Sequence, residues 1–384
     1  MQPSPGDARI LCISFSPLST DARVLRQLAV LAEFGAVTTL GYGPAPADAV
    51  RHHEVPRSAV SLPQTPGGVL ALALRRHRSV ELTAPGERAA AALLADEAPF
   101  DLVVANDARA LPLAFAVAGD APVWADLHEW APHENRSSVP WRVLVAPYMD
   151  SLCRRYLPRA AAVTTVNRSI AELYEQRYGV LPGVVRNAIA EQPLSPQAVD
   201  DDHVRLVHSG IAAPERTIAA LIDATDALPE RFTLDLYLMG DDDGHLGQLK
   251  RRADESPRVS IHPPVAPADL PAVLNAFDLG VFLLPIASLN NKFMLPNKFF
   301  DFVQARLGVV MSPAVETSAL IEQYDLGPQL RDHTAASLVD ALSRLSADDV
   351  RRYKQNAHAA ASALSSTTDV QTRRATVGGL VQRD

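Results

Sequence analysis

Short apolar runs alternate with amphipathic stretches along most of the chain. In the first half, runs with the length of buried strands occur at residues 9–15, 37–42, 101–106, 122–127, 162–166 and 184–187. In the second half, they occur at residues 204–208, 233–239, 259–262, 279–285 and 309–312. Continuous apolar strands separated by helical periodicity are typical of a parallel sheet that helices cover on both faces. The pattern therefore predicts an α/β protein.

The two halves of the chain begin alike. A strand pattern at residues 9–15 precedes an amphipathic helix at residues 21–34, and a second strand pattern at residues 204–208 precedes a helix at residues 215–228. Between the halves, residues 190–202 (AEQPLSPQAVDDD) are polar and contain prolines, as linkers do. The repeated beginning predicts two Rossmann-like domains.

Length and composition agree with this division. A chain of 384 residues with 47% hydrophobic content is too long for one ordinary domain. We assign residues 1–190 to an N-terminal domain and residues 203–365 to a C-terminal domain. Residues 366–384 form a C-terminal tail, for which one expectation is a helix that packs back on the N-terminal domain.

Composition also indicates where the protein resides. No apolar run approaches the roughly 18 residues of a membrane span, and no basic region precedes the first apolar stretch, so we expect no signal peptide. The two cysteines, Cys12 and Cys153, lie in apolar surroundings, as buried thiols in a reducing cytoplasm do. The net charge of −8 argues against nucleic acid as a partner. These features predict a cytoplasmic protein.

Residues 290–302 (NNKFMLPNKFFDF) are the most informative segment. They follow the strand pattern at residues 279–285 and open an amphipathic helix. The chain has only four lysines against 32 arginines, and two of the four, Lys292 and Lys298, lie here. A helix N-terminus offers free N–H groups and the positive end of the helix dipole, so cations beside it form a site for phosphate. Asp301, one turn after Lys298, is then placed to accept hydrogen bonds from a ribose; the alternative is a solvated lysine–aspartate pair.

The longer run at residues 295–313 (LPNKFFDFVQARLGVVMSP) carries a specific likeness. It resembles the donor-binding segment of retaining glycosyltransferases of family four, in the variant form where a proline, a small polar residue and a lysine precede the ribose-binding acid. In that comparison Asp301 takes the place of the second glutamate of a Glu, seven residues, Glu pattern, and Phe293 stands where the first would be. The resemblance spans most of the chain. It implies a GT-B fold, with two Rossmann-like domains whose parallel sheets face a central cleft.

The resemblance assigns the donor to the C-terminal domain. The first strand-to-helix turn of that domain is where a diphosphate approaches the sheet, and Arg216 there is suited to chelate phosphate oxygens, unless it is only a solvated first-turn residue. No lysine follows in this turn, so Lys298 is expected to replace the missing cation. The implied donor residues are Ser209, Gly210, Arg216 and Lys298 for the diphosphate, Asp301 for the ribose, and Asn290, Asn291, Lys292 and Asn297 for the donor sugar loop.

His128 follows the strand pattern at residues 122–127. The family carries a histidine here that contacts the donor sugar close to the reacting carbon, so the resemblance makes His128 the catalytic residue, with Glu129 orienting its ring. The alternative is a capped loop histidine. A zinc site with His133 is disfavoured, because residues five apart lie about 140° from each other on a helix and Pro132 interrupts the helix.

The acceptor side is expected on the rim of the N-terminal domain. Asp21 and Arg23 open the first helix, and Asp107 ends the strand pattern at residues 101–106. With Glu129 they are the acceptor-side candidates. The alternative for Asp21 is a role confined to capping the helix and complementing its dipole.

Residues 240–244 (GDDDG) imitate an Asp-any-Asp metal motif. They follow the strand pattern at residues 233–239, where the family has a glycine turn near the nucleotide. Adjacent carboxylates are most often a solvated helix start. We therefore expect no metal, with a divalent cation at these aspartates as the alternative.

Two stretches, residues 69–78 and 141–159, mix apolar residues with clustered arginines. Such helices can lie on an anionic membrane, which would suit a lipid-linked acceptor. The alternative is a pair of surface helices with their apolar sides packed inward. A peripheral contact at the inner membrane face is thus one expectation.

Residues and resemblance together predict a retaining, hexosyltransferase-like enzyme. It would move a sugar from a nucleoside diphosphate sugar to the hydroxyl of a small-molecule, glycan or lipid-linked acceptor, without metal or another cofactor. One alternative is a catalytically silent GT-B subunit that binds sugar nucleotides, because the first glutamate and one phosphate lysine are missing. A GT-B sugar-nucleotide epimerase is another, although it would need several carboxylates around the sugar and residues 290–298 contain none.

Overall fold

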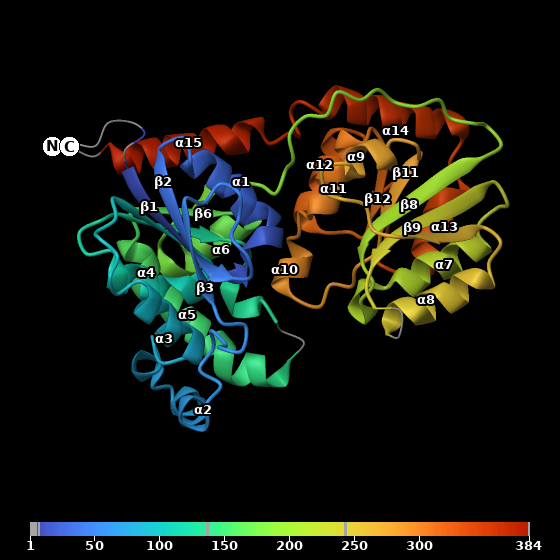
Figure 1. Ribbon diagram of the computed structural model, residues 1–384. Coiled ribbons are helices and arrows are strands. Elements are labelled where there is room, and N and C mark those ends of the chain that lie inside the picture. Colours follow the sequence, from blue (N-terminus) through green and yellow to red (C-terminus); the bar gives the residue numbers. More distant parts are fainter. Residues whose placement is uncertain (1–5, 7, 136–137, 242–243, 383–384) are drawn as a thin grey trace. The chain divides into compact units, whose positions relative to one another are not determined.

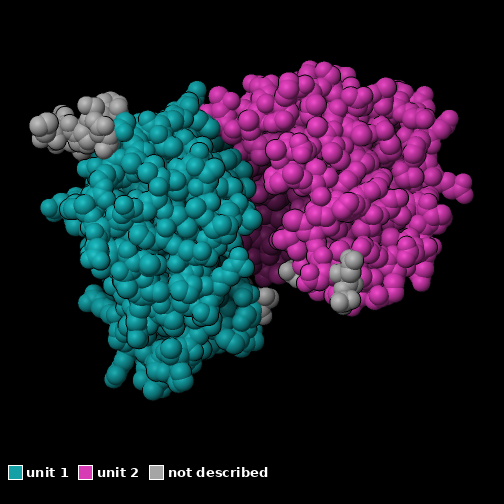
Figure 2. Space-filling view, viewed as in Figure 1, with its two compact units in different colours: residues 1–186, 368–384 teal, residues 187–367 magenta. Residues whose placement is uncertain are grey.

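The computed structural model describes residues 6, 8–135, 138–241 and 244–382. The chain folds into two compact units (Figures 1 and 2). Unit 1 comprises Met1–Arg186 and Thr368–Asp384, and unit 2 comprises Asn187–Thr367.

Unit 1 is built on a seven-stranded parallel sheet in the order β3-β2-β1-β4-β5-β6-β7. Its strands are β1 (Ala8–Pro17), β2 (Gly35–Tyr42), β3 (Arg51–Val55), β4 (Leu102–Asn106), β5 (Val123–Leu127), β6 (Ala162–Thr165) and β7 (Gly183–Val184). Its helices are α1 (Ala22–Leu31), α2 (Pro66–Ala73), α3 (Pro85–Leu93), α4 (Leu111–Val117), the π-helical turn η5 (Trp141–Val145), α5 (Ala146–Tyr156), α6 (Arg168–Tyr178) and α15 (Thr367–Val381). The strand order reverses between β1 and β4, and ligands of such sheets bind where the order reverses.

Unit 2 is built on a five-stranded parallel sheet in the order β10-β9-β8-β11-β12. Its strands are β8 (Val204–Ile211), β9 (Phe232–Met239), β10 (Val259–His262), β11 (Leu279–Phe282) and β12 (Gly308–Met311). Its helices are the short turn η7 (Pro214–Arg216), α7 (Ile218–Ala227), α8 (His245–Asp254), α9 (Leu270–Leu274), α10 (Leu289–Lys292), α11 (Asn297–Gln304), α12 (Val315–Gln323), α13 (Ala335–Ser343) and α14 (Ala347–Ala360). The order reverses between β8 and β11, which makes this the expected ligand edge of unit 2.

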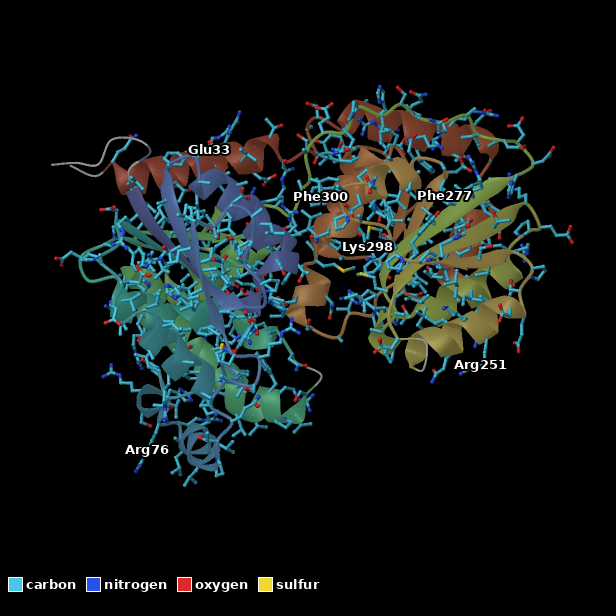
Figure 3. All side chains as sticks on the ribbon, in the orientation of Figure 1. Glu33, Arg76, Arg251, Phe277, Lys298 and Phe300 are labelled. Carbon is cyan, nitrogen blue, oxygen red and sulfur yellow. The ribbon has the colours of Figure 1, made fainter. Side chains whose placement is uncertain are left out.

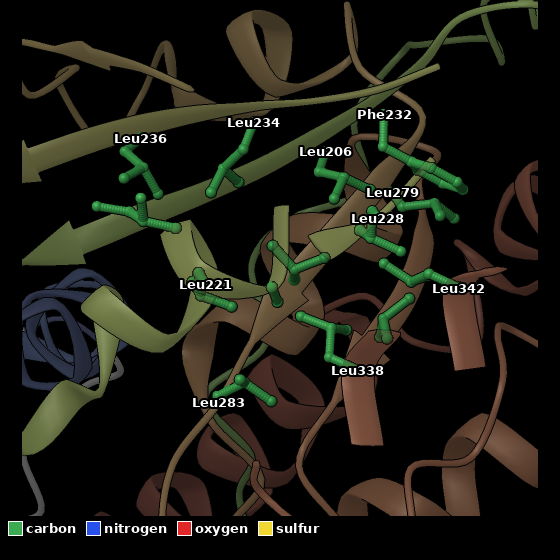
Figure 4. Packing of buried hydrophobic residues seen from close by; sticks show 14 of the residues in the cluster. Leu206, Leu221, Leu228, Phe232, Leu234, Leu236, Leu279, Leu283, Leu338 and Leu342 are labelled. Atoms are coloured by element: carbon green, nitrogen blue, oxygen red, sulfur yellow. The ribbon is translucent and has the colours of Figure 1, made fainter. Parts of the chain in front are cut away.

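The core of unit 2 shows why its strands are rich in apolar residues. Leucines from β8, β9 and α13 point toward one another in Figure 4, among them Leu206, Leu234 and Leu338, each 1% exposed. A second cluster on the other side of the sheet contains the phenylalanines of α11. Helices therefore cover both faces, as the sequence predicted.

Helix α15 closes unit 1 from the far end of the chain. Val377 and Leu380 are buried in the same cluster as Ala8 and Ile10 of β1. Arg374 pairs with both carboxylate oxygens of Glu33, which Figure 3 labels beside α15. Unit 1 is thus assembled from both ends of the chain.

The boundary of unit 2 differs from the predicted linker. Residues 185–203 contain no helix or strand, but unit 2 begins at Asn187, so all of residues 190–202 belong to it. The buried Arg306 holds this segment by donating to the carbonyls of Gln192 (2.6 Å) and Leu194 (3.1 Å). Polar composition marked a segment without regular structure, and these long-range hydrogen bonds fasten it to one unit.

The structure bears on two expectations from composition, the absence of a membrane span and the burial of both cysteines. Among the described residues, no helix is long and apolar enough to cross a bilayer. Cys12 and Cys153 are both buried free thiols.

Candidate active site

The switch point of unit 2 begins with Gly210 near the end of β8. Its backbone has φ +150°, and a Cβ atom at this position would lie 2.5 Å from Lys298 Nζ. A side chain cannot fit without displacing that ammonium group, so glycine is required by this close approach. The first strand-to-helix turn of unit 2 and the start of α11 therefore meet at this edge of the sheet.

Lys298 is the second residue of α11, and Figure 3 labels it within unit 2. Its Nζ lies 5.6 Å from the ring centroid of Phe282 at the end of β11. Burial and the nearby charge of Arg216 lower the pKa of Lys298 to about 8, against the opposing charge of Asp301. Within the described part of the chain, neither the Lys298 nor the Arg216 side chain has a hydrogen bond or ion pair. Two neighbouring cations repel each other, and for Lys298 the charge of Asp301 does not outweigh burial and the charge of Arg216. A bound anion would relieve that repulsion.

The turn that carries Arg216 is held in an uncommon conformation. Thr217 has φ +49° and ψ +31°, and its hydroxyl donates to the carbonyl of Leu283 at 2.8 Å. Left-handed backbone at a β-branched residue costs free energy and persists where surrounding contacts impose it, often at functional sites. Helix α7 begins at the next residue, so its free N–H groups lie at the same turn.

His208 is a buried residue of β8 beside this site. Its Nδ1 donates to the carbonyl of Val281 at 2.9 Å, and its ring stacks on Phe282 with a centroid distance of 5.9 Å. Burial, Lys298 and Arg216 together lower the pKa of His208 to about 3. The ring is therefore neutral and adds no third positive charge.

The structure gathers the predicted diphosphate residues at one edge of the sheet, and part of the predicted sugar loop is a short helix. Ser209, Gly210, Arg216, Lys298 and Asp301 lie on β8, η7 and α11 around the switch point. Asn290, Asn291 and Lys292 form α10 instead of the predicted loop, and Asn297 is the exposed first residue of α11. The Asn291 amide oxygen accepts from Ser288 Oγ at 2.9 Å, and the exposed Lys292 ammonium lies 5.3 Å from the Phe293 ring centroid.

In unit 1, Asp126 is the centre of a buried polar network at the end of β5. Arg23 donates to both carboxylate oxygens, at 2.6 and 2.9 Å, and Gln27 and Thr164 donate as well. Burial opposes ionisation of Asp126, but the Arg23 charge and these hydrogen bonds outweigh it and lower its pKa. Bidentate pairing of this kind fixes both side chains in one geometry.

His128 lies at the edge of that network with 18% of its side chain exposed. Its Nε2 is 3.1 Å from Asn106 Oδ1, and its Nδ1 is 3.3 Å from Asp107 Oδ2. Asp107 also accepts from the His128 backbone N–H at 2.9 Å. Asn106 and Asp107 thus orient the ring, a role that the sequence had assigned to Glu129.

Asp107 has a strained backbone. Its φ of +64° with ψ +162° falls in a region that is essentially reserved for glycine. It directly follows β4 at the switch point of unit 1, and its N–H donates to the Asp126 carbonyl at 2.9 Å. Backbone strain of this kind is often found at functional sites, so this edge is the candidate site of unit 1.

The acceptor-side prediction needs one correction. Arg23 is 4% exposed and committed to Asp126 and to the Val185 carbonyl, so its guanidinium supports the network and does not face an acceptor. Asp21 caps α1 by accepting from the Arg23 and Val24 N–H groups at 3.2 Å, which is the helix-capping alternative.

Glu129 and Asp107 line a cavity of about 480 Å³ in unit 1. Glu134 and Arg109 line it too and pair with each other at 3.2 Å. Burial, with Glu134 and Asp107 nearby, raises the pKa of Glu129 to about 8. The cavity therefore offers polar groups of mixed charge directly beside His128.

Metal ligation finds no geometric support in the described part of the chain. No group of three or more His, Cys, Asp or Glu side chains there is placed to hold an ion. Asp242 and Asp243 of the GDDDG segment lie outside the described residues.

The sequence placed His208 at the diphosphate turn without a role, and Phe282 and Asp126 were not predicted as members of these sites. His208 and Asp126 each had a signal, since a polar residue near the end of an apolar strand pattern reaches the ligand edge of a parallel sheet. The pairing of Arg23 with Asp126 spans 103 residues and has no local signal.

Comparisons with known proteins agree with this architecture. Residues 36–192 match the family model of Glycosyltransferase Family 4. HepE from Anabaena, solved with UDP-glucose, is 19% identical, covers 97% of this chain and all of its own, and superposes with a TM-score of 0.66. Sucrose-phosphate synthase from Thermosynechococcus elongatus is 14% identical over 97% of this chain and 99% of its own, with a TM-score of 0.70. A glycosyltransferase from Rickettsia africae is 11% identical over 98% and 99%, with a TM-score of 0.66. No curated protein matches the sequence.

Two parallel Rossmann-like units and these structural neighbours define the fold as that of the GT-B glycosyltransferases, which confirms the predicted fold class. The resemblance to glycosyltransferase family 4 is confirmed as well, through the match at residues 36–192. That match lies in the first half of the chain, whereas the likeness noted from the sequence rested on residues 295–313.

Proposed function

We propose that the chain is a retaining glycosyltransferase that moves a sugar from a nucleoside diphosphate sugar to an acceptor hydroxyl without a metal ion. The observation that carries the proposal is the pair of cations, Arg216 and Lys298, at the switch point of unit 2. Among the described residues neither side chain has a hydrogen bond or ion pair, although the charge of Asp301 acts on Lys298. The start of α7 adds free N–H groups beside them. A diphosphate supplies the charge that this site is missing. The family match and the UDP-glucose bound to HepE support a nucleotide sugar as its source.

The cations have a role in the chemistry as well as in binding. As the bond from the anomeric carbon to the diphosphate oxygen breaks, negative charge collects on the leaving group. Groups already in place around that charge stabilise the transition state without reorganising, each by roughly 2 to 3 kcal/mol. Front-face attack by the acceptor oxygen then forms the new glycosidic bond, and the departing phosphate takes the acceptor proton. This route retains the anomeric configuration and requires no paired carboxylates.

The proposal is tested first by donor binding. Lys298→Ala and Arg216→Ala should each weaken binding of a nucleoside diphosphate about tenfold or more in calorimetry, because each removes a charge-assisted hydrogen bond. Lys250→Ala and Arg251→Ala on α8 are controls matched in residue type. Unchanged affinity in both site variants would rule out unit 2 as the donor unit.

Product analysis separates the proposal from its rivals. A screen of UDP, GDP, TDP and CDP sugars with candidate acceptors should give a glycoside of unchanged anomeric configuration by NMR. Epimerised donor without acceptor would identify an epimerase, and binding without turnover would identify a silent subunit.

The transferase activity should persist in EDTA. Loss in EDTA that magnesium restores would contradict metal independence and point to the GDDDG segment.

We also propose a peripheral contact with anionic membrane through one face of unit 1. Helix α2 and η5 pack together, and Arg75 donates to the Val143 carbonyl between them at 2.8 Å. Leu70, Leu74 and Val143 are each more than half exposed on this face. Exposed arginines flank them, including Arg76, which Figure 3 labels. Apolar side chains ringed by arginines fit the interface of an anionic bilayer.

Vesicle co-sedimentation tests this contact. Wild-type protein should bind phosphatidylglycerol vesicles and not phosphatidylcholine vesicles, and Leu70→Ser with Leu74→Ser should abolish binding. Val50→Ser removes an even more exposed apolar side chain outside this face, and this variant should bind normally. If the Leu70→Ser, Leu74→Ser variant bound phosphatidylglycerol vesicles as well as Val50→Ser did, α2 would not be part of the membrane contact.

A further inference from the structure

Two cavities of unit 1 share part of their lining. The first, of about 480 Å³, contains Asp107 and Glu129 beside His128. The second, of about 460 Å³, lies toward the ends of β1 and β2, where Phe15 and Tyr42 line it. Leu62, Gln64 and Arg109 line both cavities. A single ligand of sugar size or larger can therefore contact both.

The two cavities differ in charge. The first contains the carboxylates of Asp107, Glu129 and Glu134 with one arginine, Arg109. The described lining of the second contains two arginines, Arg57 and Arg109, and no carboxylate. The first cavity thus suits hydroxyl groups, and the second suits an anion.

Both arginines of the second cavity have unused donors. Arg57 is exposed and makes no hydrogen bond or ion pair with the described residues. Arg109 donates one Nη to Glu134, while its buried Nε has no partner in the part of the chain that is described. Guanidinium groups bind phosphate oxygens through two parallel N–H donors, so this pair is equipped for a phosphate group.

The carboxyl groups near Arg109 do not neutralise it fully. Burial raises the pKa of Glu134 to about 7 and that of Glu87 to about 8, although Arg109 opposes both shifts. Both groups are therefore less readily ionised than exposed carboxyl groups, so they offset the charge of Arg109 less.

We propose that the acceptor is a phosphorylated sugar, whose phosphate binds Arg57 and Arg109 in the second cavity and whose reacting hydroxyl lies in the first cavity beside Asp107 and Glu129. The inference rests on the proposed transferase function and adds the chemical class of its acceptor. Phe15, Pro17, Val60 and Leu62 give the second cavity an apolar wall. The phosphate can belong to a soluble sugar phosphate or to a lipid-linked sugar phosphate, since the shared chemistry is the phosphate ester.

Equilibrium binding tests the proposal without turnover. The Arg216→Ala, Lys298→Ala double variant serves as the background, so that the donor site does not capture the probe. Glucose 1-phosphate and glucose 6-phosphate should bind at least about tenfold more tightly than glucose, and Arg57→Gln should remove that advantage. Arg51→Gln, an exposed arginine of β3 outside both linings, should not. A dodecyl ester of glucose 1-phosphate in phosphatidylcholine vesicles provides the lipid-linked arm.

The outcomes separate this inference from the proposed function. Tighter binding of either the soluble glucose phosphates or the dodecyl ester in vesicles supports the phosphate site. Which of the two binds more tightly shows whether the acceptor phosphate belongs to a soluble or a lipid-linked sugar. Equal binding of glucose and both phosphates, an Arg57→Gln variant that keeps the preference, or equally tight binding of glucuronate would each overturn it. Nucleoside diphosphate affinity is measured in parallel on Arg57→Gln in the otherwise wild-type chain. Intact donor binding with no sugar-phosphate preference removes only the acceptor assignment, whereas absent donor binding removes the transferase proposal.

Discussion

Lys298 shows how a charged side chain is held ready for a ligand. Its ammonium group lies 5.6 Å from the centre of the Phe282 ring, the charge of Arg216 acts on it, and the nearby His208 is neutral. Burial and like charge make the protonated form costly in the free protein, whereas a bound diphosphate would favour it. Proton uptake and diphosphate binding are therefore linked at this one residue.

That linkage predicts a pH dependence of diphosphate affinity. The pKa of Lys298 is about 8 in the free protein, and a bound diphosphate raises it. Affinity should be highest below pH 8, where the lysine is already protonated, and should fall as the pH rises above 8, by at most about tenfold per pH unit. Calorimetry with UDP between about pH 7 and pH 10 measures this, a range in which the nucleotide's own phosphate is already ionised.

The control for this titration is Lys298→Arg. Arginine stays protonated throughout the range, so its affinity profile should be flat. A wild-type profile without a decline above pH 8 would show that Lys298 does not contact the diphosphate.

Asp301 permits a second test at the residue scale. Asp301→Asn should lower affinity for a nucleotide sugar and leave pyrophosphate binding unchanged, because the carboxylate is assigned to ribose hydroxyls. Competition binding with both ligands measures the difference. An equal loss for pyrophosphate would mean that Asp301 supports the charge of Lys298.

His128 was predicted as the catalytic residue, and its surroundings sharpen the test. His128→Ala should lower turnover by roughly 10² or more, the scale of a positioned transition-state contact. Diphosphate affinity should stay unchanged, since the proposed diphosphate site lies in unit 2. Asn106 and Asp107 contact the ring, so a thermal melt accompanies the assay. A variant that melts early would favour a structural histidine, and a stable, fully active one would exclude His128 from the reaction.

At the scale of elements, the strand-to-helix turns position both candidate sites. The turn after β8 depends on Gly210 and on the left-handed Thr217, and the turn after β4 depends on the strained Asp107. Each lies where the strand order of its sheet reverses. Backbone geometry, rather than side-chain length alone, therefore brings the functional groups together.

Gly210→Ala tests the first of these turns. A Cβ atom would lie 2.5 Å from Lys298 Nζ, so the flexible lysine must move away from the diphosphate position. We expect a loss of diphosphate affinity of about tenfold and a destabilisation of roughly 1 to 3 kcal/mol from the unfavourable φ. Gly379→Ala in α15 meets no atom within 4 Å and serves as the control. If Gly210→Ala bound the diphosphate with full affinity, the position of Lys298 beside this turn would not be needed for diphosphate binding.

The elements also show what the sequence could predict. Strands that are buried along their whole length, such as β4 and β12, were located within one residue, because burial on both faces leaves a strong local signal. The edge strand β3 (RHHEV) was missed, since it is polar and partly exposed. Residues 290–295 read as a loop, but Ser288 caps Asn291 and starts the short helix α10.

The candidate sites, too, could be predicted only where the sequence carries a local signal. The meeting of Gly210, Arg216 and Lys298 could be predicted, because the ends of parallel strands share one edge. The pairing of Arg23 with Asp126 could not, because it depends on register between distant strands and on a helix that packs across them.

At the scale of the whole molecule, the chain returns to unit 1 after completing unit 2. Helix α15 contributes Val377 and Leu380 to the unit 1 core, and Asp369 pairs with Arg186 just before the boundary between the units. The described core clusters of unit 2 contain no residue of α15. The last helix should therefore matter for the stability of one unit only.

Deletion of residues 368–384 tests this expectation. Loss of the buried Val377 and Leu380 should destabilise unit 1 by about 3 to 6 kcal/mol, a large fraction of the 5 to 15 kcal/mol typical of a domain. The truncated chain should show an early unfolding transition in a calorimetric melt and a second transition that UDP shifts upward, because the proposed diphosphate site belongs to unit 2. Arg374→Ala is the contrasting variant: its ion pair with Glu33 is exposed on both sides, so it should cost less than about 1 kcal/mol. If UDP binding were lost together with the unit 1 transition in the truncated chain, the donor site could not be a property of unit 2 alone.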